Sequence, residues 1–488
     1  MRKTRALTAA ALLPLLMLLL SSPLFAAQGE VTGLQRYTLA NGLEVFVLEN
    51  HVVPLVRIEI AFRCGGITQT PETVGLFHLY EHMLFKGNRV FKTQSDFQAA
   101  MKELGVASWN GGTSGENVSY YFTVPADKMA KGIEFWANAV RYPLFNKDEL
   151  ETEKGVVWSE VQGMINDPND IYQSGVDKAL FWKYPWRKDV GGYEKVIKSA
   201  TVKTMQDIQS SYYIPNNAAL FIGGDVDPKT VRAAVDKYFG DWKKGTSPWA
   251  TPLPPQAPLA SNTQLVFPDD QMYNGVVLAE INLRGPDVLA DPAATYAADT
   301  WGKLIEDPNG KFKADIFAKV PGLYKKEYIS AYYATQRDGG FIGFGTYMIL
   351  TPEQDTFARL EALRQAFFDE VKLMATDPNY FNPHDFEVMR GKLADERILE
   401  RETVDGFIGS LSFWWATAST DYYLTYPDNL RKVGFAQLKK FLTDYIVGKN
   451  SILSVRMNPA DYQAEKASAE KMKYTVLTKD NAYWWEGK

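Results

Sequence analysis

The spacing of apolar residues in the first half of the chain predicts both strands and helices. "LVRIEIAFRCG" from Leu55 and "ENVSYYFTVP" from Glu116 alternate apolar and polar positions, which is typical of strands. The Asn41-Gly42 pair in "TLANGLEVFVLEN" predicts a hairpin turn between two further strands. Residues 127–143 and 147–165 repeat apolar residues at helical spacing. Strands followed by helix pairs predict an α+β fold, with helices packed on a largely antiparallel sheet.

A Pro-rich stretch divides the chain into two halves that end alike. Ser247–Asn262, "SPWATPLPPQAPLASN", cannot continue a helix or a central strand, so we predict a linker. Near each end, "YYIPNNAALFIGGDVDPKTV" from Tyr212 and "DYIVGKNSILSVRMNPADY" from Asp444 share an Asn-containing turn, an apolar strand and an Asx-Pro helix start. We predict two domains of similar fold, residues 31–246 and 263–488, although chance similarity is the alternative.

The first 26 residues predict a secretory signal peptide. A basic "MRKTR" precedes the apolar "ALTAAALLPLLMLLL", and "SSPLFAAQ" offers cleavage after Ala26 or Ala27. The apolar run is shorter than the ~20 residues that cross a bilayer, but an uncleaved anchor is the alternative. We therefore expect a periplasmic or secreted protein that has no membrane association after cleavage.

Composition narrows the possible function. The chain of 488 residues is 46% hydrophobic and 23% charged, as in globular proteins, and it is too long for one core. Its formal net charge of −5 and the lack of a basic patch argue against nucleic acid as a partner. Cys64 is the only cysteine, which excludes intramolecular disulfides and cysteine metal sites.

One apolar segment carries an unusual group of ionisable residues. The stretch Gly75–Asn88, "GLFHLYEHMLFKGN", holds two of the four histidines in the chain. We predict a helix that begins at Thr70–Glu72 and ends at the Gly-Asn pair. Because this helix would be apolar nearly all round, it should be buried. At about 100° per residue, His78, Glu81 and His82 share one face.

Buried ionisable groups need partners, because an unsatisfied polar group costs ~1–3 kcal/mol. One divalent metal held by His78 and His82 satisfies both imidazoles. Zinc suits two neutral imidazoles and a carboxylate, with the fourth position left for water. Glu81 is then free to act as general base on that water. Hydrogen-bonded core histidines are the alternative.

A third ligand should be a carboxylate from another element. The predicted helix "LETEKGVVWSEVQ" offers Glu151, Glu153 and Glu160, of which the last two share a face. Glu160 has a Trp two residues before it and a Val directly after it, which suggests that it is the more buried of the two glutamates. We predict Glu160 as the ligand and Glu153 as the residue that orients a histidine. Glutamates on a solvated helix face are the alternative.

With these residues in view, the chain resembles a known family. H-x-x-E-H is the inverzincin signature, and "LANGLEV", "HLYEHMLFKGN", "NGGTSGENVSYYFTV" and "ETEKGVVWSEVQ" extend the likeness over most of residues 34–245. The chain is similar to the pitrilysin and insulin-degrading-enzyme family of zinc metallopeptidases. The likeness is to its shorter two-domain branch, which includes mitochondrial processing peptidase and bacterial periplasmic relatives. The second half resembles the family weakly.

The resemblance implies a role for each candidate residue. One zinc ion per chain would bind His78, His82 and Glu160. Glu81 would be the catalytic base, and Glu153 would support catalysis at the site.

The resemblance also implies a peptide-binding strand. "ASWNGGTSG" would be an edge strand on which a peptide substrate is laid, with Asn110 and Gly111 at the reacting carbonyl. A peptide can join a sheet edge through main-chain hydrogen bonds, and glycines allow close backbone approach. A flexible loop is the alternative for this stretch.

One part of the family pattern is missing. Active relatives carry an Arg and, seven residues on, a Tyr around a Gly-Leu pair of the second domain. Aligned on Gly322-Leu323, these positions hold Ala318 and Lys325 here. Nearby candidates for the missing pair lie out of register: Tyr324, Tyr328 and Arg337. We therefore expect a non-catalytic second domain and a heterodimer in which a paralogous subunit supplies the Arg/Tyr pair.

Three functions follow from these patterns. The leading hypothesis is a zinc endopeptidase that hydrolyses peptides or unfolded segments. The second is a non-catalytic assembly subunit with a retained zinc site. The third is a peptide-binding or chaperone module with structural zinc. A structural zinc site is normally closed by a fourth protein ligand, and the other histidines, His51 and His384, lie in unrelated contexts.

Overall fold

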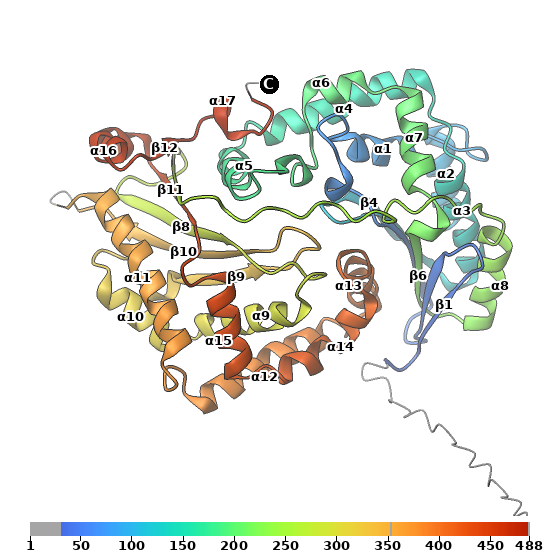
Figure 1. Ribbon diagram of the computed structural model, residues 1–488. Coiled ribbons are helices and arrows are strands. Elements are labelled where there is room, and N and C mark those ends of the chain that lie inside the picture. The colour runs from blue at the N-terminus through green and yellow to red at the C-terminus, as the bar shows by residue number, and fades with distance from the viewer. Residues whose placement is uncertain (1–30, 352–353, 487–488) are drawn as a thin grey trace, which may run out of the picture.

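The computed structural model describes residues 31–351 and 354–486 of the chain. It contains two six-stranded sheets, each flanked by helices (Figure 1). The predicted signal peptide lies outside the described residues. Within the described part, none of the helices combines the length and apolarity needed to cross a bilayer.

The first sheet contains the strands predicted from alternating residues. Its order is β1-β2-β6-β3-β5-β4; β2 and β6 are parallel, and the other pairs are antiparallel. Strands β1 and β2 form the predicted hairpin, and Gly42 in its turn has a φ of +91°, which favours glycine. The strands span Leu34–Thr38 (β1), Glu44–Glu49 (β2), Leu55–Phe62 (β3), Ser108–Thr113 (β4), Val118–Pro125 (β5) and Ala218–Gly224 (β6).

The second sheet repeats this arrangement. In the order β12-β7-β11-β8-β10-β9, the pairs of β7 with β11 and with β12 are parallel and the rest are antiparallel. The series β7-β11-β8-β10-β9 therefore matches β2-β6-β3-β5-β4, so the predicted α+β fold in two similar halves is confirmed. The strands span Thr263–Pro268 (β7), Val276–Arg284 (β8), Ser330–Ala334 (β9), Phe341–Ile349 (β10), Ile452–Met457 (β11) and Thr475–Val476 (β12).

Helices of the first half include both predicted helical segments. Residues 127–143 contain α3 and residues 147–165 contain α4. Strand β6 is followed by α8, which begins at the predicted Asp-Pro pair. The helices are Leu76–Leu84 (α1), Gln94–Glu103 (α2), Met129–Arg141 (α3), Lys147–Met164 (α4), Pro168–Leu180 (α5), Glu194–Ser199 (α6), Val202–Tyr212 (α7) and Pro228–Phe239 (α8).

The predicted start of the first helix is wrong. Pro71 and Glu72 lie in a turn that runs to Gly75, and α1 begins only at Leu76. Gly75 before it has a φ of +80°, and a Cβ there would lie 2.5 Å from the carbonyl oxygen of Gly191. The chain therefore breaks at Gly75 because the backbone of a distant loop approaches it closely.

Helices of the second half follow the same plan. Helix α16 begins at the predicted Asn-Pro pair after β11. His384 lies in the first turn of α12. The helices are Pro292–Glu306 (α9), Lys311–Lys319 (α10), Thr356–Thr376 (α11), Pro383–Leu399 (α12), Val404–Thr417 (α13), Thr420–Arg431 (α14), Phe435–Tyr445 (α15), Pro459–Lys471 (α16) and Lys479–Ala482 (α17).

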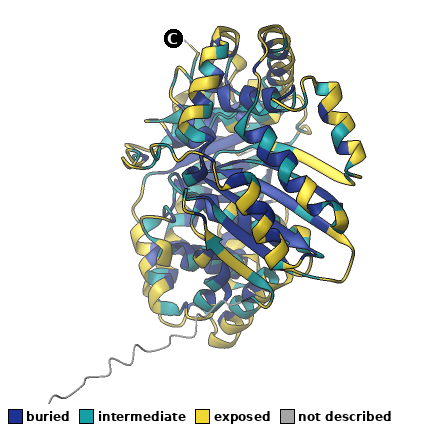
Figure 2. Cartoon of the chain, turned by 90° about the vertical axis from the view of Figure 1, so that its right-hand side faces the viewer, coloured by how far each residue is buried: buried dark blue, intermediate teal, exposed yellow. Residues whose placement is uncertain are grey.

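Each half lends one helix to the sheet of the other half. Alternate strand residues put Phe46 and Phe221 on the face of the first sheet opposite α3 and α8, where α13 covers them with Phe407, Ile408, Leu411 and Trp415. Helix α5 of the first half packs in turn on β7, β8 and β11. Figure 2 shows the result, with buried strands inside and helices whose outer sides are exposed.

The Pro-rich stretch between the halves forms neither helix nor strand. It crosses from one sheet to the other in an extended path (Figure 1). Two of its carbonyls accept hydrogen bonds from the first half, that of Pro254 from Arg187 (2.7 Å) and that of Pro258 from Trp182 (3.0 Å). The stretch is therefore fastened along the junction of the halves.

Candidate metal centre

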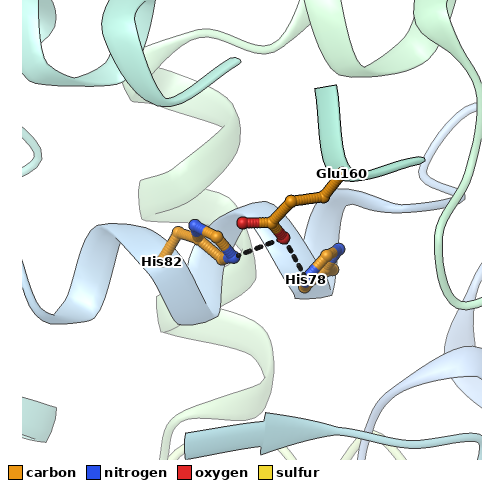
Figure 3. Close-up of side chains that lie close together, drawn as sticks. All are labelled: His78, His82 and Glu160. Atoms are coloured by element: carbon orange, nitrogen blue, oxygen red, sulfur yellow. Dashed lines mark ion pairs between the residues drawn. The ribbon is translucent and has the colours of Figure 1, made fainter. Parts of the chain in front are cut away.

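Helices α1 and α4 bring two imidazoles and a carboxylate together (Figure 3). Oε2 of Glu160 lies 3.5 Å from Nε2 of His82 and 3.7 Å from Nε2 of His78. The two rings are 4.9 Å apart and nearly perpendicular. Among the described residues, this is the one group of three or more potential metal ligands of these types within 4.8 Å of one another.

These separations fit a zinc ion. Typical Zn–N and Zn–O bonds of about 2.0–2.2 Å place neighbouring tetrahedral ligand atoms roughly 3.4 Å apart. The distances of 3.5 and 3.7 Å are too long for good hydrogen bonds but close to this spacing. The cluster can therefore hold a metal with three protein ligands and leave one position open.

The environment of His78 favours the neutral imidazole that a metal requires. Burial, followed by the charge of His82, lowers the pKa of His78 to about 4. Its Nδ1 is buried and has no hydrogen-bond partner among the described residues. The imidazole of His78 is thus uncharged at neutral pH and can serve as a metal ligand.

His82 is oriented from behind by Glu153. Nδ1 of His82 lies 3.1 Å from Oε2 of Glu153, and Nζ of Lys86 lies 2.6 Å from the other carboxylate oxygen. Burial opposes ionisation of Glu153, but hydrogen bonds with His82 and Lys86 outweigh it and hold its pKa below the usual range. Lys86 was not predicted from the sequence; it lies four residues after His82, just past the end of α1.

The predicted order of burial for the two glutamates is wrong. Glu153 is 3% exposed, whereas the side chain of Glu160 is 45% exposed. A helix face is set by residues three or four apart and not by sequence neighbours. Val157 beside Glu153 is buried, and Val156 beside Glu160 is exposed.

Glu81 lies next to the cluster and is held by a threonine. Oγ1 of Thr113, on β4, donates a hydrogen bond of 2.7 Å to Oε2 of Glu81. Burial raises the pKa of Glu81, although the Thr113 hydrogen bond and the charge of His82 act against this. Thr113 was not singled out from the sequence because a lone Thr in a Gly-rich stretch carries no specific signal.

Strand β4 lies at the edge of the first sheet, as the resemblance implied, and the loop alternative is wrong. Asn110 is exposed, and its Oδ1 accepts a hydrogen bond of 3.0 Å from the amide of Gly111. A Cβ at Gly111 would lie 2.8 Å from the ring of Phe85, so glycine lets the strand pass over α1.

The three nearby candidates for the missing Arg/Tyr pair are Tyr324, Tyr328 and Arg337 of the second half. Tyr324 and Tyr328 are exposed, with ring centroids 5.4 Å apart, and the Tyr324 amide pairs with the carbonyl of Tyr347 on β10. The amide of Arg337 donates to Glu116 (3.1 Å), and its guanidinium lies 4.5 Å above the Trp249 ring. Arg337 is therefore engaged at the junction of the two halves.

Two family profiles match parts of the chain. The sequence profile "Insulinase (Peptidase family M16)" matches residues 45–190, which include α1 and α4. A second profile, "Peptidase M16 inactive domain", matches residues 199–393. The chain belongs to the insulinase family. In this insulinase-family chain, His78, His82 and Glu160 therefore lie in the segment that the first profile matches.

Sequence relatives of this insulinase-family chain include proteins named as zinc proteases. It is 26% identical over 210 residues to "Uncharacterized zinc protease YmxG" of Bacillus subtilis, covering 43% of this chain and 51% of the relative. It is 27% identical over 234 residues to "Zinc protease PqqE" of Helicobacter pylori, covering 46% and 52%. The chain thus spans about half the length of these curated relatives.

Solved structures share the insulinase-family fold. A protease from Helicobacter pylori has a TM-score of 0.72 at 17% identity, covering 87% of this chain and 99% of that chain. The periplasmic protease PqqL from Escherichia coli has a TM-score of 0.70 at 13% identity, covering 93% of this chain and 52% of that chain. At these identities the likeness establishes the fold alone.

Proposed function

We propose that the protein is a zinc-dependent endopeptidase that hydrolyses peptides or unfolded segments. The observation that carries this proposal is the group formed by His78, His82 and Glu160, with Glu81 beside it. Three protein ligands and an open position are typical of catalytic zinc, whereas structural zinc normally has four protein ligands. The names of the zinc-protease relatives support the same metal and reaction class.

Each residue of the site has a part in this reaction. Zinc, when bound, polarises the peptide carbonyl and makes water more acidic. Glu81 accepts a proton from the attacking water and passes it to the leaving amine. Thr113 fixes one carboxylate oxygen of Glu81 and leaves the other for this transfer. The raised pKa of Glu81 brings its basicity closer to neutral pH, where such a base is most effective.

The edge strand β4 is the proposed seat for the substrate. An extended peptide would add to this edge through main-chain hydrogen bonds. Asn110 and Gly111 lie on the same strand as Thr113, which contacts the proposed base. The scissile carbonyl would therefore lie between β4 and the metal ligands of α1.

We further propose that the active enzyme contains two chains. Ala318 and Lys325 occupy the positions of the family Arg/Tyr pair, so a paralogous subunit would supply that pair. In this proposal residues 31–246 are catalytic, 247–262 are the linker and 263–488 are non-catalytic. Because this chain covers 52% of the PqqL chain, two such chains match the length of the longer relative. The N-terminal pattern supports a periplasmic or secreted location.

The presence of Ala318 and Lys325 in place of the Arg/Tyr pair also supports one alternative function. A chain without the Arg/Tyr pair could serve as a non-catalytic subunit that binds peptides. The Glu81→Gln variant separates the two functions when it is purified alone and with candidate partner chains. Zinc content by elemental analysis and cleavage of an unfolded peptide substrate are the two readouts.

The endopeptidase proposal expects Glu81→Gln to keep about one zinc per chain and to lose hydrolysis by roughly 10²–10⁴-fold. An active wild type whose rate is unchanged by Glu81→Gln would refute the assigned base. Zinc-loaded wild type that is inactive with every partner would favour the peptide-binding subunit. Full activity of the lone wild-type chain would rule out the two-chain requirement.

A further inference from the structure

A loop of the first half, residues 184–192, contacts both helices that carry the metal cluster. A Cβ at Gly192 would lie 2.7 Å from the Cα of Gly75, the residue before α1. A Cβ at Gly191 would lie 3.5 Å from the side chain of Val161, which follows Glu160 on α4. This loop therefore lies where it can set the distance between the start of α1 and the ligand-bearing turn of α4.

Gln69 joins the loop to the start of α1. Its side-chain amide donates to the carbonyls of Asp189 (2.7 Å) and Trp186 (3.2 Å). Its side-chain oxygen accepts a hydrogen bond of 2.7 Å from the amide of Gly75. Because Gln69 is buried, water does not compete for these bonds, and a shift of the loop would be transmitted to α1.

The last residues of the second half hold this loop from the other side. Nε1 of Trp484 donates to Oδ2 of Asp189 (2.8 Å), and Oδ1 of Asp189 accepts from the amide of Gly192 (2.8 Å). The Trp484 ring is buried in the core of the first half, 5.8 Å from that of Trp186. Trp485 stacks on Tyr193, just after the loop, with ring centroids 5.4 Å apart.

The loop is not held by close packing alone. A pocket of about 260 Å³ lies among α4, α5, the loop and the C-terminal segment, and Val161, Asp170, Asp177, Asp189, Trp484 and Trp485 help to line it. Side chains next to such a space can move into it when a restraint is removed. The bond between Trp484 and Asp189 therefore adds a directional restraint on the side of the loop that lines this pocket.

We propose that Trp484 and Asp189 are positioning residues for the metal centre. Through the loop they fix α1 against α4, and so fix His78 and His82 against Glu160. The end of the second half thus completes a site whose ligands all belong to the first half. This inference rests on the proposed zinc function.

The test compares two matched substitutions in the full-length chain. Trp484→Phe keeps an aromatic ring in the core but removes the N–H donor to Asp189. Trp182→Phe is the control, because it removes an indole hydrogen bond of similar length whose acceptor, the carbonyl of Pro258, belongs to the linker and not to the loop. Zinc affinity is measured by competition with a chromogenic chelator, and ligand geometry by the visible absorption of the cobalt-substituted protein.

We expect Trp484→Phe to weaken zinc binding by about tenfold or more and to alter the cobalt spectrum, as changes around metal ligands do. Trp182→Phe should match wild type in both. Asp189→Asn should act on the same bond, so the double variant should lose less affinity than the two single losses combined. Zinc affinity of Trp484→Phe within twofold of Trp182→Phe would overturn the proposal.

A second readout separates this inference from the proposed function. Hydrogen exchange of the α1 amides is measured in the metal-free protein. Exchange at the start of α1 should be faster in Trp484→Phe than in Trp182→Phe. If wild type binds no zinc, the proposed function fails. Whether or not zinc binds, equal hydrogen exchange at the start of α1 in the two variants would show that the C-terminal segment does not position α1.

Discussion

Replacing Glu153 by Gln tests how the buried side of the metal centre works. The substitution keeps the size of the side chain and one acceptor oxygen, but it removes the negative charge. In wild type that charge lies 3.1 Å from Nδ1 of His82 and 2.6 Å from Nζ of Lys86. The variant therefore leaves the ammonium of Lys86, whose side chain is 14% exposed, without its carboxylate partner.

The expected magnitude follows from these contacts. Loss of a carboxylate that supports a metal-bound histidine typically lowers metal affinity by about 10- to 100-fold. This corresponds to about 1.4–2.7 kcal/mol. We expect the upper part of this range because Glu153 is only 3% exposed, so solvent cannot replace the lost charge.

The pH dependence gives a second signature with a defined sign. Burial alone would lower the pKa of His82, but the hydrogen bond with Glu153 and nearby carboxylates raise it in the metal-free protein. Because zinc needs the neutral imidazole, zinc affinity falls as pH drops below this pKa. Glu153→Gln should lower the pKa of His82, so its zinc affinity falls only at more acidic pH. The gap between wild type and variant should therefore narrow as pH falls.

Competition with a chromogenic chelator from about pH 5.5 to pH 8 measures both effects. Glu151→Gln is the matched control on the same helix, because it also removes a carboxylate from a buried lysine, Lys154, while Glu151 itself is exposed. Because this carboxylate pairs with Lys154 and not with a histidine of the cluster, the control should bind zinc as wild type does. Wild-type affinity of Glu153→Gln at about pH 8, or a gap that widens towards acid, would refute the orienting role.

Two further predictions concern stability. Burial raises the pKa of Asp299 from 3.8 to about 6, so its contribution to stability is full below pH 3.8 and is lost as pH rises through about 6. Asp299→Asn should therefore flatten the pH dependence of the unfolding free energy by up to about 3 kcal/mol between pH 4 and pH 7. Urea titrations that show the wild-type pH dependence in this variant would contradict the prediction. Leu411→Ala in α13 should lower the unfolding free energy by about 2–5 kcal/mol in the same assay, because Leu411 is buried against the first sheet. Phe413→Ala on the same helix should lower it much less, because Phe413 is exposed. Equal losses of unfolding free energy in the two variants would contradict the packing of α13.

Much of the fold could be predicted because local patterns agree with it. Alternating apolar and polar residues predicted β3 and β5, and apolar residues at helical spacing predicted α3 and α4. The grouping of His78, Glu81 and His82 followed from helical geometry alone. In each case the spacing of residues along one element determines which side chains lie together.

The remaining features depend on contacts between distant segments. The break before α1 arises from the approach of the Gly191 backbone to Gly75, which no local pattern reveals. Thr113 and Lys86 gained their partners only when β4 and α4 packed against α1. The contact of Trp484 with Asp189 joins residues 295 positions apart, and no periodicity carries that information.

The exchange of helices between the halves has a consequence for biogenesis. After β6 is synthesised, about 190 more residues are needed to complete α13, which takes roughly 10–40 s at typical translation rates. During that interval the face of the first sheet that carries Phe46 and Phe221 has no cover, and an uncovered sheet face is prone to aggregate. The nascent chain therefore needs either delayed collapse or a chaperone that shields this face until the C-terminal third arrives.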